Sequence, residues 1–76
     1  MREAETRLIW ETFSSVAPYL VYPQDLRELL EKLVEEETDI EAFLEQLKEM
    51  VSEEADPTRK TDGQIFMSEL RRRFSG

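Results

Sequence analysis

The sequence predicts a small all-α domain of four short helices, with five as an alternative, around a central antiparallel αα-hairpin. Apolar residues recur at three- and four-residue spacing along most of the 76 residues, which is typical of helices with one buried face. Only two glycines and three prolines interrupt a composition rich in Leu, Glu, Lys and Arg. The length suits one domain, and a 39% apolar content is enough for one core. We therefore expect residues 1–76 to form a single domain.

A first helix is predicted from Glu3 to about Ala17. Pro18 should end it, because proline lacks an amide hydrogen and disfavours helical dihedrals in the residue before it. The connector that follows, residues 19–22, is unusually apolar for a loop, so we expect it to lie against the core. The apolar positions that share one face of this helix are Ile9, Trp10, Phe13, Val16 and Ala17.

A second helix should begin at Pro23, since a proline in the first turn has no amide that needs a partner, and Asp25 complements the positive end of the helix dipole. A third should begin near Asp39, because Thr38 and Glu41 have the spacing of a capping box. So short a connection favours an αα-hairpin. The two apolar stripes are Leu26, Leu29, Leu30, Leu33 and Val34, then Ile40, Phe43, Leu44, Leu47, Met50 and Val51.

Residues 53–62 have no hydrophobic periodicity and contain a proline, so they are expected to form a flexible polar loop. Thr61 and Gln64 repeat the capping-box spacing and predict the start of a short fourth helix. Gly63 in the first turn should weaken that helix. Its apolar stripe is Phe66, Met67, Leu70 and Phe74.

The composition indicates a protein that is not an enzyme. The absence of cysteine and histidine excludes disulfides, thiolate zinc sites, cysteine nucleophiles and the usual physiological proton shuttle. The serines lack an activating histidine, and no glycine run could cradle a phosphate. Carboxylate pairs such as Glu31 and Glu35 fall on the polar face of a predicted helix, where they serve solvation. We expect no catalytic residue, no metal and no cofactor.

Charge argues against two classes of partner. With 18 acids and 10 bases, the formal charge of −8 repels phosphate backbones, so we expect no nucleic acid partner. The first residues mix charges into every turn, which is not the pattern of a membrane span. We expect no membrane association and an intracellular location, cytoplasmic or nuclear.

The charges are unevenly distributed along the chain. Residues 23–56 hold 13 acids and 3 bases, whereas residues 57–76 hold 5 bases and 2 acids. The basic segment could offset the self-repulsion of the acidic hairpin, or it could flank a groove for an acidic peptide. Both interpretations stay open at the level of the sequence.

The run DLRELLEKLVEEETDIEAFLEQLKEMVSEE, residues 25–54, resembles the central helix-turn-helix of the αα-hub domains. The likeness rests on the two leucine-rich stripes, with Asp39 and Ile40 at the turn. This group includes harmonin-homology, TAF-homology, RST and paired amphipathic helix domains, and the harmonin-homology domains match best. Several of them have a fifth helix. The segment IFMSELRRRF, residues 65–74, is similar to their next helix.

The resemblance implies a domain that binds short, disordered, helix-forming segments of partner proteins in a hydrophobic groove. Such domains serve as scaffolds or adaptors in transcription or genome maintenance. The implied basic rim is Arg71, Arg72 and Arg73. The groove implied by the same likeness would comprise Leu29, Leu33, Phe43, Leu47, Met50, Phe66 and Leu70.

Two other functions remain as alternatives to peptide binding. The leucine stripes could close on a second copy and complete a marginal core, which would make the chain a homo-oligomerisation module. The acidic hairpin could also make it a small inhibitor of a basic protein. For the peptide-binding function we expect a monomer or a weak dimer with a protein partner.

Overall fold

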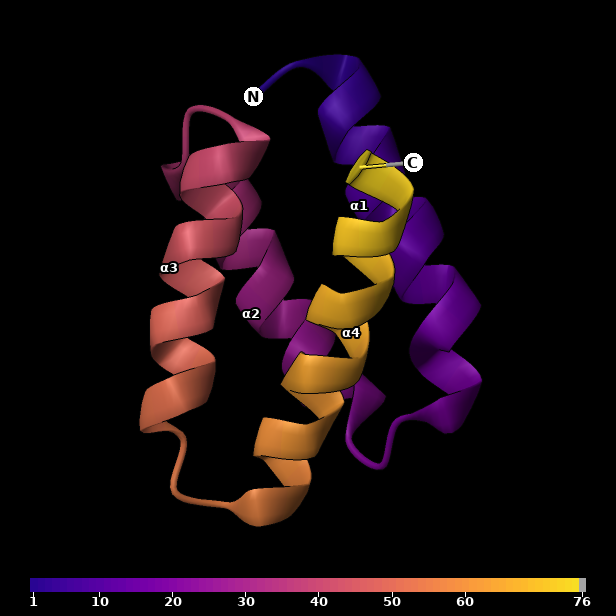
Figure 1. The fold of residues 1–76 in the computed structure, drawn as a ribbon, viewed down its shortest axis with the longest axis vertical. Helices are drawn as coiled ribbons and strands as arrows, with labels where there is room; N and C mark the ends of the chain where they lie inside the picture. The colour runs from indigo at the N-terminus through magenta and orange to yellow at the C-terminus, as the bar shows by residue number, and fades with distance from the viewer. Residues whose placement is uncertain (76) are drawn as a thin grey trace.

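The computed structural model describes residues 1–75, which fold into four α-helices and one short 3-10 helix (Figure 1). These residues contain no strand, and the all-α prediction is confirmed. The 3-10 helix follows α1 directly and carries Pro18 near its start. The elements are α1 (Glu3–Val16), η1 (Ala17–Tyr19), α2 (Pro23–Glu36), α3 (Ile40–Glu53) and α4 (Pro57–Ser75).

The helices form a bundle in which α4 contacts all three other helices. Its contacts with α1 and with α3 are more extensive than those between α2 and α3. The short turn at residues 37–39 joins α2 and α3 into an antiparallel pair at one end of the molecule (Figure 1). Two connectors, residues 20–22 and 54–56, lie at the opposite end. α4 therefore packs against both members of the α2–α3 pair.

The core runs through the middle of the bundle and draws on every α-helix. Phe43 of α3 and Phe66 of α4 are both fully buried, and their rings meet edge to face with centroids 6.4 Å apart. Aromatic pairs favour this geometry over a face-to-face stack. The buried apolar residues are Ile9, Val16, Leu20, Leu26, Leu30, Leu33, Ile40, Phe43, Leu47, Val51, Phe66, Met67 and Leu70.

Residues 19–22, the apolar segment expected to be a connector, pack against the core less than their composition predicts. Leu20 is buried, but Tyr19 is 75% exposed, Val21 63% and Tyr22 40%. The backbone explains the difference, because the amides of Val21 and Tyr22 donate to the carboxylate of Asp62 on α4. With their amides directed at α4, these residues leave their side chains in solvent. The expectation of a packed connector holds only for Leu20.

The capping of α3 differs from the predicted capping box. Asp39 is the N-cap residue, in an extended conformation, and its carboxylate accepts the amide of Ala42 at 2.8 Å. Thr38 lies one residue too early for this role. Threonine and aspartate are both good N-cap residues, so the sequence left the N-cap of α3 ambiguous between two adjacent positions. In the structure the aspartate is the N-cap. The pairing of Thr38 with Glu41 was wrong.

The long polar loop predicted at residues 53–62 is absent, because α4 begins at Pro57. Asp56 caps the helix, accepting the amides of Thr58 at 2.8 Å and Arg59 at 3.3 Å. Thr61 does not cap a helix; its hydroxyl donates to the carbonyl of Pro57 one turn earlier. An aspartate followed by a proline at the first helical position is a strong start signal. The connector between α3 and α4 is therefore only three residues long, Glu54–Asp56.

Gly63 marks a tight contact between α4 and α3. A Cβ atom at this position would lie 2.5 Å from Cγ2 of Val51, which is well inside van der Waals contact. The glycine lowers helix propensity, as expected from the sequence. In return it leaves room for the Val51 side chain against the backbone of α4, and both residues are buried at the contact.

Candidate functional site: a cleft between three helices

A cleft of about 240 Å³ opens between α2, α3 and the first two turns of α4. Leu29 and Met50 are partly buried and project into it from facing helices. The other apolar lining residues belong to the core below them. The full apolar lining is Leu26, Leu29, Met50, Val51 and Gly63, and the polar rim is Tyr22, Asp25, Glu54, Arg59 and Asp62.

Arg59 closes one side of the rim. Its guanidinium lies 3.0 Å from the carboxylate of Asp25 and 5.3 Å from the centre of the Tyr22 ring. The ion-paired side chains are about half exposed, at 50% and 45%, so the pair contributes only about 0–1 kcal/mol to stability. Its effect is mainly geometric, because it holds the partly exposed tyrosine beside the mouth of the cleft.

Asp62 holds the backbone of Tyr22, one of the rim residues, in place. It is only 3% exposed, and its two carboxylate oxygens accept the amides of Val21 at 3.0 Å and Tyr22 at 2.8 Å. A buried carboxylate needs such donors, since desolvation without them is costly. The contact ties the connector to α4 across about forty sequence positions. No local pattern in the sequence signals this role.

Five of the seven groove residues expected from the sequence do not line a groove in this structure. Leu33, Phe43, Leu47, Phe66 and Leu70 are at most 1% exposed, because α4 covers the open side of the α2–α3 pair. This cover extends further than expected, since α4 begins at Pro57 and not near Thr61. The two remaining members, Leu29 and Met50, do line the cleft.

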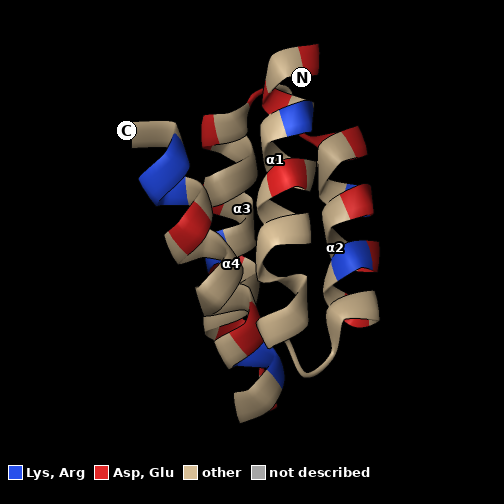
Figure 2. Cartoon of the chain, turned by 90° about the vertical axis from the view of Figure 1, so that its right-hand side faces the viewer, with Lys and Arg blue, Asp and Glu red and all other residues tan. Residues whose placement is uncertain are grey.

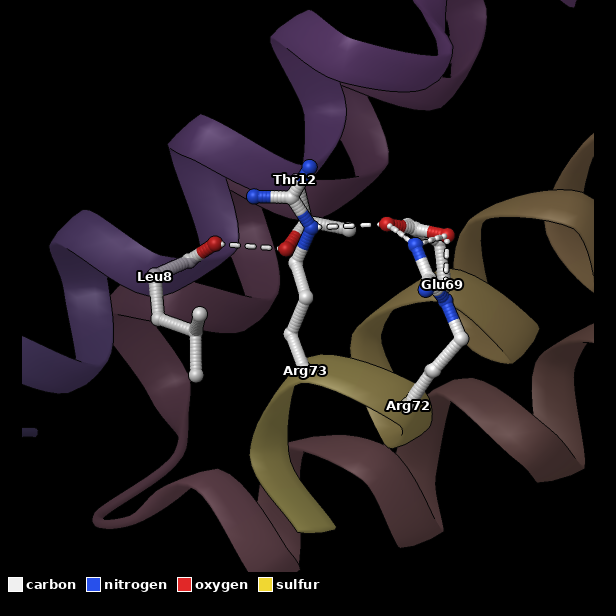
Figure 3. A network of polar contacts seen from close by, with 5 residues as sticks. All are labelled: Leu8, Thr12, Glu69, Arg72 and Arg73. Atoms are coloured by element: carbon white, nitrogen blue, oxygen red, sulfur yellow. Dashed lines mark hydrogen bonds and ion pairs between the residues drawn. The ribbon is translucent and has the colours of Figure 1, made fainter. Parts of the chain in front are cut away.

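The three consecutive arginines do not form a basic rim around this cleft. Arg72 and Arg73 both contact Glu69, at 2.7 and 2.8 Å (Figure 3). The hydrogen bonds from Arg72 and then Arg73 lower the pKa of the Glu69 carboxyl below its usual 4.5. Arg71 lines a different hollow, between α3 and α4. All three lie near the end of α4 that is remote from the cleft (Figure 1).

A band without charged residues adjoins the cleft. Residues 12–24 contain no acid or base, although 37% of the chain is charged. In Figure 2 the ribbon is accordingly tan, without interruption, along the second half of α1 and the loop that follows it. Tyr19, Val21 and Tyr22, here called the connector patch, are the exposed large apolar side chains of this band. Asp62 lies between the patch and the cleft and lines hollows on both sides.

The cleft suits individual side chains better than a whole small molecule. Its volume is below the roughly 300–1,000 Å³ of typical ligand pockets. Within residues 1–75, no group of three or more Asp or Glu side chains is placed to hold a metal ion. None of the helices in that range is both long and apolar enough to cross a membrane. The chemistry offered by the cleft is apolar contact, with a few hydrogen-bonding groups at the rim.

Comparison with known proteins assigns the chain to a family without adding a relative of known role. No curated protein and no solved structure matches it. The model of the MJ1579 family matches residues 9–75, which include most of α1 and all of the other helices. The chain belongs to the MJ1579 family.

Proposed function

We propose that this chain is a non-enzymatic protein-interaction domain that binds a short helix-forming segment of a partner protein. An apolar anchor side chain of the partner enters the cleft between Leu29 and Met50. The neighbouring residues of the segment pack on the connector patch. The protein thereby acts as an adaptor or scaffold component.

The observation that carries this proposal is an apolar cleft that continues into an uncharged surface on a highly charged protein. Both Leu29 and Met50 are only partly buried, and Tyr22 extends the apolar surface beyond the rim. Exposed apolar patches with polar rims mark interaction sites more often than they serve folding. Methionine adds an adaptable, polarisable contact. The resemblance of residues 25–54 to αα-hub domains supports the same class of function.

Peptide selection tests the proposal directly. A library of displayed amphipathic helical peptides is selected on immobilised wild-type protein, and the affinity of each selected peptide is then measured by fluorescence anisotropy. Leu29→Gln and Met50→Gln should each weaken binding by about tenfold, because an apolar anchor loses its desolvated contact.

Leu44→Gln is the matched control, since Leu44 is also partly buried on α3 but does not line the cleft. Circular dichroism establishes that all three variants are folded. The proposal is wrong if selection yields no saturable binder, or if Leu44→Gln weakens binding as much as the cleft variants do.

Self-association is a second candidate, and the connector patch favours it. Tyr19 at 75% and Val21 at 63% exposure form an apolar surface that a second copy could cover. Sedimentation velocity across a hundredfold range of concentration measures this. A wild-type dimer that becomes monomeric with Tyr19→Ser and Val21→Ser would support self-association. A wild type that is monomeric at the highest concentration would exclude it.

A further inference from the structure

A shallow hollow between α3 and α4 gathers basic side chains on an otherwise acidic protein. Its volume is about 250 Å³, and it lies on the far side of the Val51–Gly63 contact from the cleft. Three bases line it, and no acid does. The lining residues are Lys48, Val51, Ser52, Lys60, Gln64, Met67, Ser68 and Arg71.

The three bases, here called the basic strip, are Lys48, Lys60 and Arg71. None of them forms an ion pair with another of residues 1–75, whereas Arg7, Arg59, Arg72 and Arg73 all do. Arg2, Arg27 and Lys32 also lack such a pair, so what distinguishes the strip is that no acid is among the residues that line its hollow. The strip therefore presents uncompensated positive charge.

The strip follows the groove between two antiparallel helices. Lys60 and Arg71 are eleven residues apart on α4, a rise of about 16 Å along the helix axis. Lys48 comes from α3, on the opposite wall. The floor between the bases is apolar, formed by Met67 and Val51. A groove with this shape fits a helix that carries acids on one face and small apolar residues beside them.

We infer that the basic strip docks an acidic helical segment of a partner protein. Charge complementarity selects this occupant, because three bases and no acid line the hollow although the protein as a whole has a net charge of −8. Beyond about 8 Å the field of distant acids is screened at physiological ionic strength, so local charge dominates at the groove. This site is separate from the cleft and does not depend on the proposed function of the cleft.

Two designed peptides test the inference. One is a fifteen-residue helical peptide with glutamates spaced by four residues, and the other is identical but has lysines at those positions. The glutamate peptide should bind wild-type protein with weakening affinity as salt is raised, and it should shift the amide signals of Lys48, Gln64 and Arg71. The lysine peptide should not shift these signals.

A charge-matched pair of variants locates the site. A triple variant should bind the glutamate peptide about tenfold more weakly or worse, when it combines Lys48→Glu, Lys60→Glu and Arg71→Glu. The control replaces three other bases by glutamate, at Arg2, Arg27 and Lys32, and changes the net charge equally. This control variant should lose much less affinity for the glutamate peptide. Equal loss in both triple variants, or no saturable binding to wild type, overturns the inference.

A third variant separates this site from the cleft. Leu29→Gln should leave the glutamate peptide bound with unchanged affinity. If Leu29→Gln lowers the affinity for the glutamate peptide as much as the triple charge reversal of the basic strip does, the peptide occupies the cleft and the inference is wrong.

Discussion

The two halves of α4 meet the rest of the bundle differently. In its second half, Phe66 and Leu70 are fully buried against α1 and α3. In its first half, Gly63 lets the backbone approach α3, but Arg59 and Asp62 replace apolar side chains on the side that faces α2. The second half closes the core, and the first half leaves a cleft. A continuous helix thus separates the residues that stabilise the fold from those available for binding.

This difference shows why an apolar stripe alone does not identify a binding surface. Leu29 and Leu33 belong to the same stripe on α2, one turn apart. Leu33 is buried, whereas Leu29 borders the cleft. What separates them is how completely the rest of the bundle covers each position, which depends on packing between helices distant in sequence.

The largest expected effect is in the closed region. Phe43→Ala should lower the free energy of unfolding by about 3–5 kcal/mol, because it removes a fully buried ring and its contact with Phe66. Phe74→Ala, which alters a ring that is 45% exposed, should cost about 1 kcal/mol or less. Urea denaturation measures both. Similar losses in the two variants would contradict the division between core and surface.

Asp62→Asn tests the link between the connector at residues 20–22 and the cleft. We expect a loss of about 2–3 kcal/mol, because asparagine keeps the shape but has only one acceptor oxygen, so its NH2 group would face one of the two backbone amides. Hydrogen exchange at the amides of Val21 and Tyr22 should accelerate more than exchange in the middle of α1. Uniform acceleration along the chain would show that Asp62 acts on global stability and not on the connector.

Gly63→Ala tests the close approach of α4 to α3. A gain in helix propensity is outweighed by overlap with a stiff β-branched side chain, so a net loss of about 1–2 kcal/mol is expected. Val51→Ala should destabilise the wild type by leaving a cavity. Combined with Gly63→Ala, it should cost less than the sum of the two single changes. Strict additivity in thermal unfolding would show that the two residues are not in contact.

The smallest effect concerns Glu69 and its two arginines. Because its pKa is lowered in the folded protein, the carboxyl contributes stability above its unfolded pKa, near 4.5, and loses it as pH falls through the lower folded pKa. In the Glu69→Gln variant, the free energy of unfolding should therefore fall less steeply than in the wild type as the pH drops below about 4.5. Glu45→Gln, at an exposed glutamate of α3, is the control. Identical pH profiles for these two variants would contradict a stabilising role of the pair.

Much of the fold could be predicted from local patterns. The starts of α1, α2 and α3 and the short turn between α2 and α3 followed from hydrophobic spacing, prolines and capping residues. The start of α4 was misplaced because residues 57–63 have no apolar stripe. Their helix depends instead on the Asp56 cap and Pro57, and this signal was present in the sequence.

The site was less predictable than the helices. Leu29 and Met50 belonged to the expected groove, but nothing local distinguishes them from Leu47, which is fully buried. The clamp made by Asp62 and the proximity of Lys48 to α4 depend on tertiary packing between residues far apart in the chain. Exposure of the connector likewise depends on where its backbone amides find acceptors.

Chemical-shift mapping with a selected helical peptide tests the central claim most directly. If the closed bundle binds through its cleft, amide signals of Tyr22, Leu29, Met50 and Gly63 should shift progressively, while those around the buried core remain nearly unchanged. Large shifts throughout the core, centred on Phe43 and Leu47, would show that the partner opens the α2–α3 pair and would contradict this account.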